Sequence, residues 1–121
     1  MTYESVKTIE SAVAPGVKFT VIRMSFGRRL ELMQQVRELA RKVEYLEAAA
    51  DAGSQMDAAM VRAEIDGLYV SWGLQSVDGL LLDGVPASPD GLRESGPEEL
   101  LREALAAIRA EAGLTETERK N

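Results

Sequence analysis

The chain has 121 residues, of which 45% are hydrophobic and 28% charged, so it is long enough to bury one modest core and is expected to fold as one domain. It contains neither cysteine nor histidine, which excludes disulfides, thiolate nucleophiles and ligands, and imidazole acid–base chemistry. We therefore expect a protein that works through binding surfaces and is not an enzyme.

The net charge of −6 is unevenly distributed along the chain. Residues 1–60 are balanced, and the whole acidic surplus falls in residues 61–121. A chain of this sign repels a phosphate backbone, and no basic patch interleaved with aromatic residues opposes that repulsion. The N-terminus lacks the pattern of a signal peptide, and no apolar stretch approaches the ~20 residues that cross a bilayer. We expect a cytoplasmic protein that contacts neither nucleic acid nor membrane.

β-Branched and aromatic residues dominate the N-terminal segment and predict a β-hairpin over residues 3–24. An Ala-Pro-Gly sequence at residues 14–16 interrupts them with turn chemistry. In the second arm Val17, Phe19 and Val21 alternate with other side chains, which predicts one clearly buried face.

Two helices are predicted over residues 25–50 and 56–72 from apolar residues spaced three and four apart. Ser25 offers an N-cap for the first helix, and the short polar break between the helices favours antiparallel packing. Gly73 is placed to end the second helix in a left-handed conformation. The first apolar stripe comprises Leu32, Val36, Leu39, Val43, Leu46 and Ala50, widened by Leu30, Met33 and Ala40, and the second comprises Ala58, Val61, Ile65, Leu68 and Trp72.

Turn chemistry dominates residues 74–92, which contain Asp-Gly dipeptides and prolines. We expect a small hairpin there, centred on Asp83-Gly84. A last helix is predicted over residues 97–112, because a proline and two glutamates suit its first turn and Gly113 suits its end.

These elements together predict an α+β fold that is mainly helical. It has an N-terminal β-hairpin, a long antiparallel helical hairpin, a small β-turn region and a C-terminal helix. We expect a single domain over residues 1–113. Residues 114–121 are mostly polar and are expected to form a flexible tail.

No pattern of a catalytic, metal or cofactor site is present in the sequence. The Asp-Gly dipeptides lack the alternate aspartates and the bidentate glutamate of an EF-hand. The carboxylates of Glu64 and Asp66, and of Glu98 and Glu99, occupy positions typical of solvated helix faces and helix starts. No glycine-rich loop has nucleotide-binding spacing. We therefore assign no catalytic residue, no metal ligand and no cofactor.

Two adjacent arginines, Arg28 and Arg29, fall in the first turn of the long predicted helix. Positive charge there opposes the helix dipole at a cost of ~0.3–1 kcal/mol for each residue, so another group is expected to compensate. One hypothesis is an ion pair with the acidic second half, for instance with Glu94 or Glu98. The other is contact with an acidic partner.

Three further side chains are candidates for contact with a protein partner. Trp72, the only tryptophan, either packs against the first helix or anchors a partner's helix. Met33 and Met60 either fill the core or supply adaptable apolar surface in a groove for an amphipathic helix. The candidate partner-binding residues are therefore Arg28, Arg29, Met33, Met60 and Trp72.

The second half of the chain carries several short segments in a characteristic order. They are Trp72-Gly73-Leu74, Val77-Asp78-Gly79-Leu80, Leu82-Asp83-Gly84-Val85-Pro86-Ala87 and the helix start Gly96-Pro97-Glu98-Glu99-Leu100-Leu101, followed by an acidic ending after Gly113. In this order they resemble the small tail assembly chaperones of long-tailed phages and prophages, over roughly residues 60–121.

The resemblance implies a non-enzymatic protein that binds helical segments of the tape measure protein while the tail tube polymerises. Such a task requires apolar grooves, a soluble acidic exterior and no chemistry. Two other classes stay open from the sequence: a structural component of the tail or virion, and a small acidic regulatory adaptor. The sequence also leaves open whether the chain forms a homo-oligomer.

Overall fold

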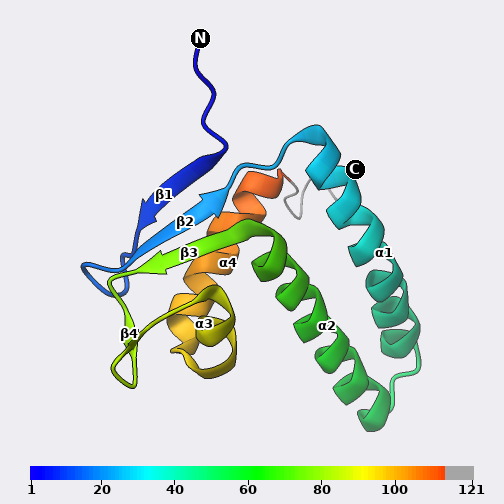
Figure 1. The fold of residues 1–121 in the computed structure, drawn as a ribbon. Coiled ribbons are helices and arrows are strands. Elements are labelled where there is room, and N and C mark those ends of the chain that lie inside the picture. The colour runs from blue at the N-terminus through cyan, green and yellow to red at the C-terminus, as the bar shows by residue number, and fades with distance from the viewer. Residues whose placement is uncertain (114–121) are drawn as a thin grey trace.

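A computed structural model of the protein describes residues 1–113, so the expected tail over residues 114–121 lies outside the described residues. The fold is α+β and mainly helical, as predicted (Figure 1). In chain order the elements are β1 (Val6–Glu10), β2 (Lys18–Ile22), α1 (Phe26–Ala48), α2 (Ala52–Gly73), β3 (Leu74–Asp78), β4 (Leu81–Leu82), β5 (Val85–Pro86), α3 (Pro89–Ser95) and α4 (Glu98–Ala112). None of the helices in this part of the chain combines the length and the apolar character of a membrane span.

A three-stranded antiparallel sheet in the order β1-β2-β3 brings together distant parts of the chain. Phe19 of β2 lies opposite Ile9 of β1 and Val77 of β3. Phe19 and Val21 are fully buried, whereas Thr20 between them is only partly buried. Because strand side chains alternate between the two faces, the predicted pattern in the second arm of the hairpin defines the buried face of the sheet.

The strand β3 departs from the prediction for residues 74–92. Its residues pair with β2 in the main sheet, and only β4 and β5 form the small hairpin. The partner strand of β3 precedes both long helices in the chain, and the local sequence pattern carries no signal for such a distant pairing. The predicted turn at Asp83-Gly84 is present, with φ of 51° and 80° at its two residues, as a two-residue hairpin turn requires.

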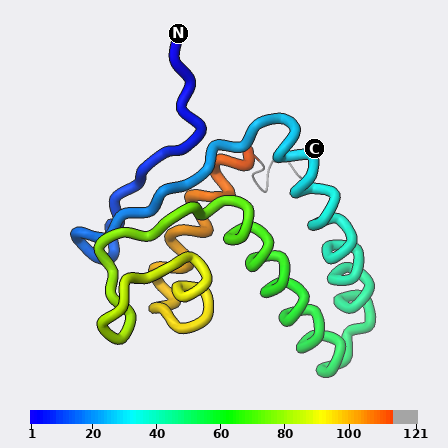
Figure 2. Tube along the Cα trace, viewed as in Figure 1, coloured from blue at the N-terminus to red at the C-terminus, as the bar shows by residue number. Residues whose placement is uncertain are grey.

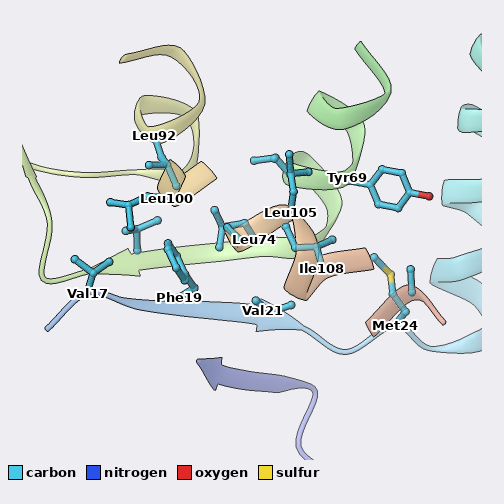
Figure 3. Close-up of a cluster of buried hydrophobic side chains, with 14 of the residues drawn as sticks. Val17, Phe19, Val21, Met24, Tyr69, Leu74, Leu92, Leu100, Leu105 and Ile108 are labelled. Atoms are coloured by element: carbon cyan, nitrogen blue, oxygen red, sulfur yellow. The ribbon is translucent and has the colours of Figure 1, made fainter. Parts of the chain in front are cut away.

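Helix α4 covers one face of the sheet (Figure 3). Its Leu105 and Ile108 belong to the same buried cluster as Phe19 and Val21 of β2 and Leu74 of β3. The other buried members of this main core are Val17, Met24, Leu32, Tyr69, Val70, Val77, Leu92, Leu100, Ala104 and Ala112. The core therefore lies between the sheet and the helices α2, α3 and α4.

The helices α1 and α2 form a long hairpin that extends away from the sheet (Figures 1 and 2). Far from the sheet, Val43, Ala58 and Val61 form a second, small cluster between the two helices. This distal part of the hairpin is thus held by its own contacts and not by the main core.

Helix α2 begins at Ala52, earlier than the predicted start at residue 56. The carboxylate of Asp51 caps the helix by accepting the Ser54 N–H at 3.1 Å. The hydroxyl and the backbone N–H of Ser54 hold the pKa of Asp51 below its ordinary value. The polar segment that the sequence suggests as a break therefore contains the first turn of the helix. Asp51, as the N-cap residue, is the sequence feature that marks the start of α2.

The prediction that Gly73 ends α2 in a left-handed conformation is wrong. Gly73 is the last residue of the helix, and the chain leaves through Leu74, which is extended (φ −102°, ψ 111°). A Cβ atom on Gly73 would clash with the side chain of Ile108. The glycine is needed for the close approach of α2 and α4. By contrast, Gly113 follows the last residue of α4, as predicted, and it has a left-handed conformation with φ of 76°.

Replacing Gly73 with alanine is expected to lower the free energy of unfolding by about 1–3 kcal/mol, because the added methyl group overpacks against Ile108. Gly27→Ala is the matched control, since Gly27 also lies in a helix and an added Cβ has nothing within 4 Å. The control should be stabilised by up to ~1 kcal/mol through helix propensity. Urea denaturation measures both variants, and a shift of the same sign in both would contradict this role of Gly73.

A carboxylate on α4 holds the turn between β1 and β2. Glu103 accepts hydrogen bonds from the Ser11 hydroxyl at 2.5 Å and from the Ala12 N–H at 2.7 Å. The buried Ser11 hydroxyl in turn accepts the N–H groups of Val13 and Ala14. The hydrogen bond from Ser11 is the main cause that lowers the pKa of the Glu103 carboxyl, with the backbone N–H groups of this turn assisting it.

Because the folded pKa of Glu103 is lowered, its ionised form contributes stability that is fully present above the unfolded pKa of about 4.3 and is lost as pH falls through the folded pKa. Glu103→Gln is expected to cost about 1–3 kcal/mol at neutral pH, and less in acid below the folded pKa. Urea denaturation at neutral pH and near pH 2 measures this difference. Glu99→Gln, at an exposed position of the same helix, is the control. An equal loss of stability in both variants would contradict the proposed role of Glu103 in holding the turn.

Candidate functional site

A groove of about 810 Å³ lies between α1, α2 and the end of α4, and we call it the interhelical groove. Its lining residues are Met33, Val36, Arg37, Ala40, Val43, Glu44 and Glu47 of α1, Arg62, Ile65, Asp66 and Tyr69 of α2, and Arg109 of α4. The groove therefore has apolar residues between two helices and charged residues beside them.

The apolar part of the groove exists because the stripe on α1 is wider than α2 covers. Leu32 and Val43 are the buried residues of α1. Met33, Val36 and Ala40 are only partly buried and line the groove at spacings of three and four. Such spacings place side chains on one helix face, so α1 presents a continuous apolar row that no described element covers completely.

At the sheet end of the groove, Arg109 of α4 contacts two residues of α2. Its guanidinium forms an ion pair with Asp66 and lies 5.0 Å from the centre of the Tyr69 ring. The Nε atom of Arg109 is buried and has no hydrogen-bond partner among the described residues. These contacts hold the end of α4 against α2 and fix the position of Tyr69 in the groove wall.

The charged residues of the groove differ in whether they are paired. Glu47 and Arg62 join α1 to α2 through a contact of 2.9 Å. Arg37 and Glu44 are exposed, and neither forms an ion pair within residues 1–113. Arg37 precedes Ala40 by three residues and Glu44 follows it by four, so the row on α1 carries opposite charges on either side of its smallest side chain.

The two candidate methionines, Met33 of α1 and Met60 of α2, line different hollows, one on each side of α2. Met33 lines the interhelical groove. Met60 is 66% exposed and borders a shallower hollow of about 580 Å³ with Leu68 and Arg93. One bound helix therefore does not contact both methionines.

Arg28 and Trp72 lie together at the seam between α1 and α2. The guanidinium of Arg28 is 5.8 Å from the centre of the Trp72 ring, a cation–π distance. The indole Nε1–H donates to Oε1 of Gln35 at 3.4 Å, and the ring packs on the main core. Trp72 is thus partly buried against the first helix, which is the packing hypothesis drawn from the sequence.

Arg29 does not form the ion pairs suggested by the sequence. Glu94 contacts Arg93 at 3.7 Å and Glu98 contacts Arg102 at 2.8 Å. The guanidinium of Arg29 instead lies at the end of α4, where a Cβ atom on Gly113 would be 2.9 Å from its Nη2. The carbonyl end of a helix carries partial negative charge, which favours a guanidinium at this place, and the buried Nε of Arg29 has no hydrogen-bond partner among the described residues.

Several groove residues are absent from the candidates that the sequence suggests. Asp66, Tyr69 and Arg109 meet only when α4 packs against α2, and no local pattern indicates that contact. Arg37 and Glu44 resemble ordinary solvated positions of a helix. The one available signal is the widening of the α1 stripe by Met33 and Ala40, which predicts more apolar surface than one neighbouring helix buries.

Within residues 1–113, no group of three or more acidic side chains is arranged to hold a metal ion. No protein-family model, curated protein or solved structure matches this chain. The candidate function therefore depends on the groove and on the order of sequence segments.

The distal part of the hairpin should open more readily than the rest of the fold, because its contacts are few: the small cluster around Val43, Ala58 and Val61 and the exposed Glu47–Arg62 ion pair. In native-state hydrogen exchange, amides of residues 39–61 are expected to exchange faster than those of α4. Val43→Ala should destabilise this region by ~2 kcal/mol and leave protection in α4 nearly unchanged. A uniform loss of protection across both regions would show that the hairpin and the core unfold together.

Proposed function

We propose that this protein is a non-enzymatic tail assembly chaperone of a phage or prophage, which binds helical segments of the tape measure protein in the host cytoplasm during tail morphogenesis. The interhelical groove is the observation that carries the proposal. The order of segments over residues 60–121 supports the assignment to this class.

The groove suits an amphipathic helix more than an extended peptide. Met33, Val36 and Ala40 form a row along the axis of α1, and Ile65 and Tyr69 form the facing wall on α2. A bound helix lying along this row would place apolar side chains at spacings of three and four between the two walls. Met33 adds an adaptable thioether surface, which tolerates different partner sequences.

A tape measure protein is long and helical, and it presents apolar stripes until the tail tube encloses it. A chaperone for such a protein has to cover these stripes reversibly and remain dissolved. The acidic surplus of residues 61–121 supports the second requirement, because net charge keeps proteins apart. The exposed charges beside the groove support reversibility, since an interface with a polar rim exchanges more readily than a closed apolar core.

The proposal is tested by co-expression with the tape measure product of the same genome. The wild-type protein should raise the solubility of that product and co-purify with it. Ala40→Glu places a carboxylate in the middle of the groove and is expected to weaken binding by at least about tenfold. Met60→Glu, on the other side of α2, is the matched control and should bind as the wild type does.

Failure of the wild-type protein in both solubility and co-purification would exclude the chaperone function. Equal binding by the Ala40→Glu and Met60→Glu variants would place the contact elsewhere on the surface. Stoichiometric presence of the protein in purified particles would instead favour a structural tail component.

A further inference from the structure

The exposed face of α1 extends beyond the interhelical groove toward the start of the helix. Phe26 is 84% exposed and Leu30 is 51% exposed. Together with Met33 they are spaced by four and three residues, so they continue the same face as Val36 and Ala40. The part of this row that lines the groove, Met33, Val36 and Ala40, is typical of a helix face that packs against another helix.

The charges on this face are self-complementary. Arg37 and Glu44 lie on either side of Ala40 and are exposed and without an ion pair within the described chain. If a second copy of α1 lies antiparallel with Ala40 near the two-fold axis, Arg37 of each copy faces Glu44 of the other. Both contacts are attractive, and the symmetry generates the second one from the first.

We infer that, in the absence of another partner, the groove is occupied by helix α1 of a second copy of this chain, in an antiparallel two-fold dimer centred on Ala40. The small side chain of Ala40 allows the two helix axes to approach closely at the crossing point. Opposite charge at Arg37 and Glu44 fixes the antiparallel direction and the register. This inference does not depend on the proposed function.

Figure 1 shows α1 on the outer side of the hairpin, with α2 between it and the sheet. In a register centred on Ala40, Ala48 at the end of the second copy's helix lies near Met33. The two copies of α1 therefore overlap over residues 32–48, and Phe26 and Leu30 lie outside this contact.

Sedimentation equilibrium of the purified full chain over a range of concentrations tests the inference. The wild-type protein should dimerise reversibly. Arg37→Glu and Glu44→Arg each replace two attractive contacts by two repulsive ones, so each should weaken the dimer by at least about tenfold. Both positions are exposed, and unchanged circular dichroism will show that the variants fold.

Mixing the two single variants gives the sharpest result. In a heterodimer of Arg37→Glu with Glu44→Arg, each introduced charge faces an opposite charge, so the mixture should regain the affinity that each variant alone loses. Lys42→Glu, which makes the same change of charge at an exposed site on another face of α1, is the control and should leave the dimer nearly unchanged.

Two results would overturn the inference. The first is a wild-type chain that stays monomeric at all concentrations, which would show that the groove does not bind a second copy of α1. The second is a dimer that responds to Lys42→Glu as strongly as to Arg37→Glu, or one that the mixture of variants fails to restore.

Discussion

The apolar face of α4 is buried against β2, where Leu105 and Ile108 share a core with Phe19 and Val21, and the positions of the other elements follow from this contact. Burial of side chains of this size contributes about 1.5–3 kcal/mol each. Because Ile108 also fills the space left by the missing side chain of Gly73, the same helix fixes the end of α2. The strand β3 begins at the next residue, so helix and sheet are joined without a loop.

This arrangement explains why a groove exists at all. The buried members of the main core include Tyr69 and Val70 of α2 but only Leu32 of α1. Helix α1 is therefore held chiefly through α2, and its remaining apolar row faces a space that the end of α4 only partly closes. Arg109 meets α2 at that closed end, and Arg29 of α1 contacts the end of α4. The groove thus has one rigid end at the core and one weakly held end at the tip of the hairpin.

Local patterns in the sequence predict most of the elements. Alternation at Val17, Phe19 and Val21 and the turn at Asp83-Gly84 each depend on neighbouring residues, and the structure contains both features. The role of Gly73 and the placement of β3 depend on contacts between segments far apart in the chain, which local patterns do not specify.

The same limit applies to the groove. Met33 is a candidate from the sequence because a methionine supplies adaptable apolar surface, and it does line the groove. Tyr69 and Arg109 join it only through tertiary packing. The sequence leaves two hypotheses for Arg29, an ion pair with the acidic second half or contact with an acidic partner, and the structure places its guanidinium at the end of α4. The end of α4 is predicted from the sequence, but its contact with Arg29 depends on tertiary packing.

The helical hairpin is inserted between β2 and β3, two strands that are direct neighbours in the sheet. The helices α1 and α2 thus connect two adjacent antiparallel strands, where an ordinary β-hairpin has a short turn. Their length is consequently free of the constraints that fix the core. Adding or removing whole helical turns in both helices at the distal tip would change the length of the groove and leave the strand pairing intact. The size of the groove is therefore independent of the sheet and core that support it.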